Sequence, residues 1–192
     1  MNGLANTSEK ILHCAQTLII AGGYHGFSYA DIAKVIGIRN ASIHHHFPSK
    51  AMLVQSLVKQ YREAAQAGIA DLERSVSDPL AQLRAYAGYW EHCIADPASS
   101  FCVCAMLAAE MSVLPEEIAL EVKAHFRMLS GWLTSVFERG KQSGSLGLLA
   151  TPQMEAEMFM ATIHGAMLSA RAYDDAKMFR VIVNPMLMRF VI

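Results

Sequence analysis

The sequence has few cysteines, no excess of charge and no uninterrupted apolar run long enough to span a membrane. Four cysteines in 192 residues are too few for a disulfide scaffold, which indicates reduced thiols. The longest uncharged stretch, residues 11–30, is broken by histidine, glutamine, threonine and glycine. It therefore predicts neither a membrane span nor a secretory signal, and we expect a cytoplasmic protein.

Charge is scarce and nearly balanced. Charged residues make up 17% of the chain and the formal net charge is −1, so no global field attracts the protein to nucleic acid. The first 50 residues carry four lysines and arginines against two acidic residues, and the remainder is net acidic. Binding of DNA must therefore be local, and with so few cations it requires a dimer that reads two half-sites.

Apolar residues, in contrast, are abundant. They make up 53% of the chain, which is rich for a protein with a wetted surface, so we expect part of the apolar surface to lie in a subunit interface. They recur at helical spacing, and no alternating run is long enough to favour a sheet. The pattern predicts an all-α fold of about nine helices.

Local signals near the N-terminus predict a helix-turn-helix. Paired glycines at 22–23 end a first helix. Ser28 is typical of a helix N-cap with Asp31 three residues later, and Gly37 suits a tight exit from that helix. A short second helix is expected over residues 40–46, because a phenylalanine and a proline follow it.

The second helix of such a unit is the one that enters the major groove of DNA. Ile43 and Phe47 are spaced to anchor it inward, which leaves polar and small side chains facing outward. Lys50 stands in the first turn of the next helix, where the helix dipole disfavours a cation but a phosphate is well held. The predicted DNA-binding residues are Ser28, Tyr29, Arg39, Asn40, Ala41, Ser42, His44, His45 and Lys50.

Residues 11–57 resemble the N-terminal domain of the TetR family of transcriptional regulators. The resemblance lies in the run IL..A..L....GY..FSYADIAK.IGI...SIHHHFPSK..L, which involves many coordinated positions. Two positions depart from the family pattern. Arg39 stands where serine or threonine often caps the recognition helix, a role that Asn40 is expected to take over, and His44 stands where tyrosine usually contacts a phosphate.

The resemblance implies a DNA-binding domain over residues 1–49 and an effector-binding and dimerisation domain over residues 50–192. It implies a homodimeric repressor of operator DNA, released by a small and partly apolar effector, with no cofactor and no enzymatic activity. Aromatic, methionine and histidine side chains in the C-terminal helices are the candidates for effector contact. They are Tyr86, Trp90, Met106, Phe126, Phe159 and His164.

A small-residue face near the C-terminus predicts the dimer interface. Gly165, Ser169 and Ala172 recur at helical spacing in a helix that is uncharged over residues 158–170, which permits close approach of a second helix. The final residues, 186–192, are largely apolar and need to be covered. In the TetR family the last two helices of each subunit form the dimer, and we expect the same here.

Other interpretations remain open for several residues. Consecutive histidines at 44–46 fan around a helix, which disfavours a metal site. Cys102 and Cys104 are either buried structural thiols or sensors of oxidants or electrophiles. Glu110 is the odd charge in an apolar run, so it either faces solvent or requires a partner. An enzyme and an effector-free DNA-binding or protein-interaction module are the rival functions.

Overall fold

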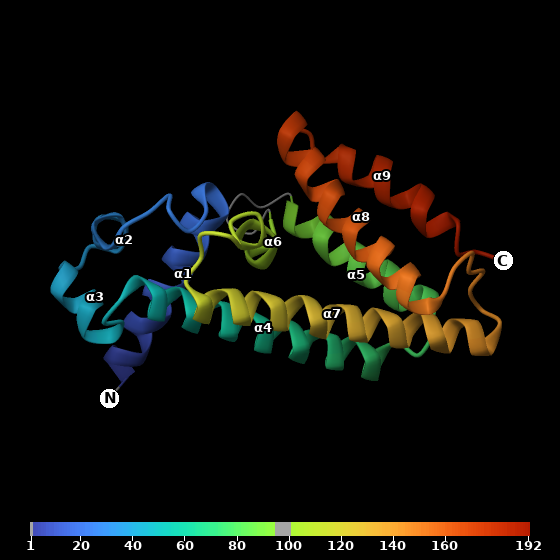
Figure 1. The fold of residues 1–192 in the computed structure, drawn as a ribbon, viewed down its shortest axis with the longest axis horizontal. Coiled ribbons are helices and arrows are strands. Elements are labelled where there is room, and N and C mark those ends of the chain that lie inside the picture. The colour runs from blue at the N-terminus through green and yellow to red at the C-terminus, as the bar shows by residue number, and fades with distance from the viewer. Residues whose placement is uncertain (1, 95–100) are drawn as a thin grey trace. The chain divides into compact units, whose positions relative to one another are not determined.

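A computed structural model describes residues 2–94 and 101–192, with side chains from residue 7 onward within those ranges. These ranges hold helices and no strand (Figure 1), which confirms the predicted all-α class. The helices are α1 Asn2–Gly22, α2 Tyr29–Ile36, α3 Asn40–His46, α4 Lys50–Ser75, α5 Pro79–Ile94, α6 Val103–Ala108, α7 Glu116–Ser143, α8 Pro152–Tyr173 and α9 Lys177–Met188. None of the helices, searched over the same ranges, is long and apolar enough to cross a membrane.

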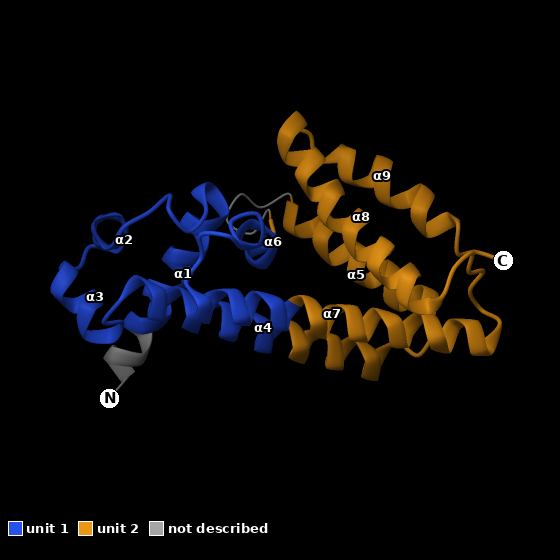
Figure 2. Cartoon of the chain, viewed as in Figure 1, with its two compact units in different colours: residues 1–64, 102–125 blue, residues 65–101, 126–192 orange. Residues whose placement is uncertain are grey.

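The chain forms two compact units (Figure 2). Unit 1 comprises residues 1–64 and 102–125, and unit 2 comprises residues 65–101 and 126–192. Unit 1 thus holds the N-terminal helices together with α6 and the start of α7. Segment 102–125 is distant in sequence from the N-terminal helices and yet packs with them. The division of function between residues 1–49 and 50–192 stays a prediction.

Short-range capping shapes the N-terminal helices of unit 1. The Ser28 side chain accepts a hydrogen bond from the amide of Asp31, and the Asp31 carboxylate accepts one from the amide of Ser28 at 2.7 Å. The Ser28 hydroxyl also donates to this carboxylate at 2.7 Å, and the hydrogen bonds from the hydroxyl and the amide of Ser28 lower the pKa of Asp31. Gly37 ends α2 with a φ of 71°, in the left-handed region that glycine adopts most easily. The predicted cap and exit are both confirmed.

Aromatic packing fills the interior of unit 2. The rings of Phe137, Phe159 and Phe190 contact one another with centroids 5.0 to 6.4 Å apart, which brings together α7, α8 and the end of the chain. All three side chains are fully buried. Rings in such offset arrangements add attraction to the free energy of burial. The C-terminal phenylalanine is therefore part of the core and not a loose tail.

A buried carboxylate fixes the entry to α8. Glu155 is fully buried, and its Oε1 accepts hydrogen bonds from the amides of Leu149 and Ala150, both at 3.0 Å. Its Oε2 forms an ion pair with Arg189 just beyond α9. Because 36% of the Arg189 side chain is exposed, solvent screens the ion pair and the two amides carry most of the stabilisation.

We predict that Glu155→Ala lowers the free energy of unfolding by about 2 kcal/mol, because two backbone donors lose their acceptor. Glu155→Gln keeps an Oε1 acceptor for both amides and is expected to lose less than half as much. Urea denaturation of the two variants measures this difference. Equal losses in both variants would show that the ion pair with Arg189, and not the amides, is the stabilising contact.

Candidate functional site

Helix α3 has a polar outer face and an apolar inner face that is buried in unit 1. Ile43 is fully buried and Phe47 is 8% exposed, as their spacing predicted. The side chains at positions 39–41 and 44–45 are exposed, and Ser42 is half-buried. Arg39 is the N-cap and makes no side-chain capping bond, so the cap expected from Asn40 is not formed. The outward face is thus available for contact with base edges in a major groove.

Tyr29 connects the two helices of the helix-turn-helix. Its hydroxyl donates to the carbonyl of Phe47 at 2.8 Å, and its ring contacts the His44 ring edge-on at 4.8 Å. Burial raises the pKa of Tyr29 to about 12, so the hydroxyl stays a donor at neutral pH. Since that donor is already engaged, Tyr29 holds the end of α3 against α2, and only its backbone amide remains for DNA. The Ser28 hydroxyl is likewise engaged, with Asp31.

Lys50 points into unit 1. Its Nζ donates to the carbonyl of Phe27 and lies over two aromatic rings, 4.1 Å from the centroid of Phe27 and 4.8 Å from that of Tyr24. Burial lowers the pKa of the ammonium, while the carboxylates of Glu110 and Asp31 oppose that shift. These contacts favour a role in holding the start of α2 and differ from the predicted contact with a phosphate.

Glu110, in the turn after α6, contacts the end of α1. Its Oε2 accepts a hydrogen bond from the amide of Tyr24 at 2.8 Å. At the preceding residue, Gly23, a Cβ would lie 2.0 Å from the Glu110 Oε1. Gly23 also has a φ of 74°, so both its conformation and the close carboxylate require glycine. Of the two interpretations of Glu110, the structure favours the one with a partner.

Polar and thiol groups of α4, α6 and α7 also meet within unit 1. Arg62 on α4 and Glu121 on α7 form an ion pair at 3.0 Å. Cys102 and Cys104 are fully buried, and hydrogen bonding with Cys102 together with burial raises the pKa of Cys104 well above its usual range. A thiol with a raised pKa forms little thiolate and reacts slowly. This favours the structural interpretation of the pair.

Predicted effector residues of unit 2 lie in an aromatic cluster. The Tyr86 ring of α5 is 5.4 Å from the Trp132 ring of α7 and 6.3 Å from the Phe159 ring of α8. Phe126 and His164 form a second pair at 5.4 Å. Trp90 lies one turn after Tyr86 on α5, whereas Met106 belongs to unit 1.

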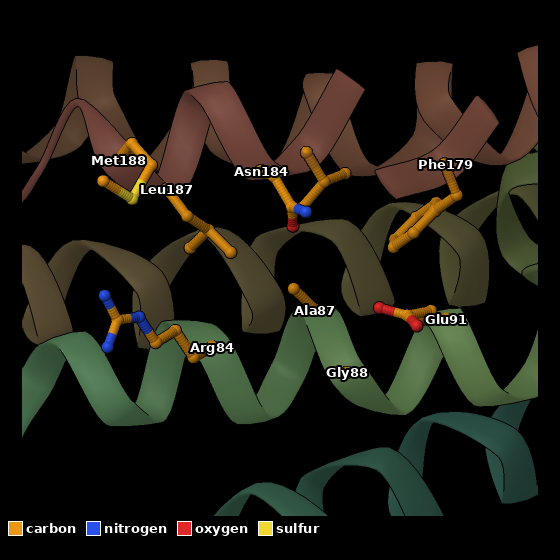
Figure 3. Close-up of a pocket in the computed structure, with 9 residues that line it drawn as sticks. Arg84, Ala87, Gly88, Glu91, Phe179, Asn184, Leu187 and Met188 are labelled. Carbon is orange, nitrogen blue, oxygen red and sulfur yellow. The ribbon is translucent and has the colours of Figure 1, made fainter. Parts of the chain in front are cut away.

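A separate groove lies between α5 and α9 (Figure 3). Ala87 and Gly88 on α5 face Asn184 and Leu187 on α9 across it, and Arg84 lies toward one end. None of the predicted effector residues lines this groove. The groove and the aromatic cluster are therefore distinct features of unit 2.

Two of the predicted dimer residues, Gly165 and Ala172, lie on an exposed apolar stripe of α8, next to Ser169. Gly165 and Ala172 are exposed, and Ser169 is half-buried. Further exposed apolar residues continue the stripe at helical spacing, and a second set lies on and after α9. The stripe comprises Met154, Met158, Ala161, Gly165, Leu168 and Ala172, and the second set comprises Val181, Met188, Val191 and Ile192. In a single chain these side chains remain in water.

Two family models match the chain. The model for bacterial regulatory proteins of the tetR family matches residues 11–57, and the model for the tetracyclin repressor-like C-terminal domain matches residues 79–186. The second match covers more than half of the chain. The chain belongs to the TetR family.

Solved structures and curated proteins agree with membership of the TetR family. A TetR-family transcriptional regulator from Agrobacterium tumefaciens is 62% identical, with a TM-score of 0.96 over 99% of this chain and 100% of that one. The nucleoid occlusion factor SlmA of Vibrio campbellii is 32% identical over 41% of each chain. IcaR of Staphylococcus aureus, the negative transcriptional regulator of the biofilm operon icaADBC, is 41% identical over 27% of each chain. The chain therefore spans less than half the length of these two curated relatives.

Membership of the TetR family gives the chain its general function as a DNA-binding transcriptional regulator with an N-terminal helix-turn-helix. The family is one of regulators and not of enzymes. Residues 2–94 and 101–192 contain no group of three or more side chains that could hold a metal ion, the histidines of α3 included.

The contacts of Lys50 generate a prediction that separates an internal role from a phosphate contact. We expect Lys50→Met to lower the free energy of unfolding by about 1–2 kcal/mol and to weaken binding of a selected operator, because the start of α2 loses a tether. The slope of log affinity against log salt concentration stays unchanged, since no phosphate contact is removed.

Lys34→Met is the matched control for Lys50→Met, because it removes an exposed lysine of α2 and is expected to leave stability unchanged. Urea denaturation and salt-titrated operator binding provide the measurements. If Lys50→Met kept full stability and flattened the salt slope by about one, Lys50 would be a phosphate ligand.

Proposed function

We propose that the chain is a homodimeric repressor that reads operator DNA with α3 and is released by a small, partly apolar effector bound in unit 2. The observation that carries the DNA-binding part is the polar outer face of α3, held on the buried Ile43 and Phe47. Only a helix whose inner face is fixed can present its outer face at a constant angle to a groove.

The exposed residues divide into two kinds of contact. Asn40, Ser42 and His45 carry groups that hydrogen-bond base edges, and the small Ala41 lets the helix approach them. Positioning contacts to phosphates come from Arg39 and His44 and from the amides at the start of α2, next to Ser28 and Tyr29. Lys50 supports this surface from the inside.

Repression and effector control are supported by different observations. IcaR is a negative regulator and is 41% identical to this chain over 27% of its length, which supports repression. The aromatic cluster of unit 2 supports an effector with apolar character, because rings from α5, α7 and α8 border one another there. An effector releases DNA only if it binds the DNA-free state more tightly.

Dimerisation is supported by the stripe on α8. An uncharged row of exposed methionine, alanine, glycine and leucine side chains is unusual on a wetted helix, and it fits against a copy of itself. With α9 it provides the apolar face of a four-helix bundle across a two-fold axis. The net charge of −1 makes the second half-site necessary for useful affinity.

We predict that Asn40→Ala changes which base is preferred at one position of each half-site. A bidentate contact to a base discriminates by about 1–3 kcal/mol, so preference there should fall about 5- to 150-fold. Selection from random DNA with the native chain and the variant measures the change. Arg39→Ala is the control, and it is expected to lower the affinity for all DNA sequences by the same factor. If Asn40→Ala also lowers the affinity for all sequences equally, Asn40 takes no part in base recognition.

We also predict that Gly165→Leu converts the dimer to a monomer and reduces operator affinity. A Cβ on Gly165 meets no atom within 4 Å in its own chain, so the new side chain can only disturb a neighbouring molecule. Gly131→Leu on α7 is the matched control, because Gly131 is equally exposed and equally uncrowded. Light scattering gives the molecular mass. A Gly165→Leu dimer with native affinity would place the interface elsewhere.

A further inference from the structure

Among the described residues of unit 2, three buried ring nitrogens have no hydrogen-bond partner. They are Nε1 of Trp90 on α5, Nε1 of Trp132 on α7 and Nε2 of His164 on α8. The two indole side chains are only 5% and 8% exposed. Buried donors are almost always paired in native proteins, because an unpaired one loses its hydration without compensation. Both indole N–H groups therefore require acceptors that the surrounding side chains do not supply.

One indole contacts Tyr86, and the other lies one helical turn away from Tyr86 on α5. The Tyr86 ring is 5.4 Å from the Trp132 ring, and Trp90 follows Tyr86 by one helical turn, on the same face of α5. The Phe159 ring completes the surface from α8 at 6.3 Å from Tyr86. Tyr86 and His164 are half-buried, so solvent reaches the edges of this cluster. The unpaired donors thus belong to an aromatic surface built by three helices.

The chemistry of these groups restricts what they can bind. An indole N–H only donates, so its partner must carry an acceptor oxygen or nitrogen. The buried polar or charged side chains of described unit 2 are Gln82 and Glu155, and both are occupied by other partners. Neither is a cation, so no buried charge compensates an anionic ligand. Flat aromatic walls favour an aromatic ligand, and the donors favour a neutral one with carbonyl-type acceptors.

We propose that unit 2 binds a neutral aromatic compound whose carbonyl-type acceptors receive hydrogen bonds from Trp90 and Trp132. This rests on the proposed function, in which the effector occupies unit 2, and it names the chemical class of that effector. His164 adds a nitrogen that donates or accepts according to its tautomer. The same donors discriminate against hydrocarbons, which leave them unpaired, and against ammonium compounds, which bring only further donors.

The test compares three probes that share one ring system. They are 2-acetylnaphthalene, 2-ethylnaphthalene and 2-naphthylmethylammonium, each titrated calorimetrically into the full chain. We expect the ketone to bind about tenfold more tightly than the hydrocarbon, and the cation to bind weakest. The chain has only two tryptophans, so a spectrum of ¹⁵N-labelled protein contains two indole N–H signals. Both signals are expected to move downfield with the ketone and not with the hydrocarbon.

Matched variants remove one donor at a time. Trp90→Phe and Trp132→Phe keep an aromatic ring but lose the N–H, so each should weaken ketone binding about tenfold and leave hydrocarbon binding unchanged. Tyr173→Phe, at the exposed end of α8, is the control and should change neither. Circular dichroism and thermal melts verify that all variants fold.

Two results would overturn the proposal. The first is equal binding of ketone and hydrocarbon with no effect of the tryptophan variants, which would mean that water satisfies the donors. The second is no binding of any probe and no change in the indole signals. Release of a selected operator is measured separately. If the ketone binds through the indoles but does not release the operator, the site is confirmed and its control of DNA binding is rejected. If the ketone releases the operator equally from the native chain and from both tryptophan variants, effector control is confirmed and this site is rejected.

Discussion

The hydrogen bond from the Tyr24 amide to the Glu110 carboxylate joins two segments separated by 86 positions. This hydrogen bond connects the end of α1 to the turn after α6, and the start of α2 lies next to them in unit 1. Lys50 lies over the Tyr24 ring, and the charge of the Glu110 carboxylate opposes the lowering of the Lys50 pKa by burial. The orientation of α2, and through Tyr29 that of α3, depends on this group of contacts.

Segment 102–125 lies in the part of the sequence that matches the family model of the C-terminal domain. In the structure, however, this segment packs with the DNA-binding helices in unit 1. A hydrogen bond to a charged group contributes about 1.5–3 kcal/mol, and allosteric coupling between two sites is typically about 1–3 kcal/mol. A single contact such as that of Glu110 is therefore large enough to matter for how α6 and the reading helix influence each other.

The sequence was informative where a structure is determined by neighbours in the chain. Ser28 and Gly37 delimited α2 because capping depends on a few consecutive residues, and the 40–46 helix was predicted to its ends. The internal contacts of Lys50 and Glu110 were not predicted, because their partners lie 23 and 86 positions away. The sequence could not separate ligand contact from core packing among the aromatic residues of the C-terminal helices, because either role suits an aromatic side chain at helical spacing. The unpaired N–H groups of Trp90 and Trp132 make that distinction, and they are seen only in a structure.

Helix α8 brings the two proposals for unit 2 onto one element. Its inner face carries Phe159 toward the aromatic cluster, and its outer face carries Gly165 and Leu168 on the exposed stripe. The two faces are separated by no more than the thickness of a helix, about 10 Å. A ligand that enters between α8 and its neighbours must displace this helix or the rings that contact it, because packed cores hold few voids. In a dimer built on the stripe, such a displacement also changes the contact between the two copies of α8, so one helix would connect ligand binding with the subunit interface.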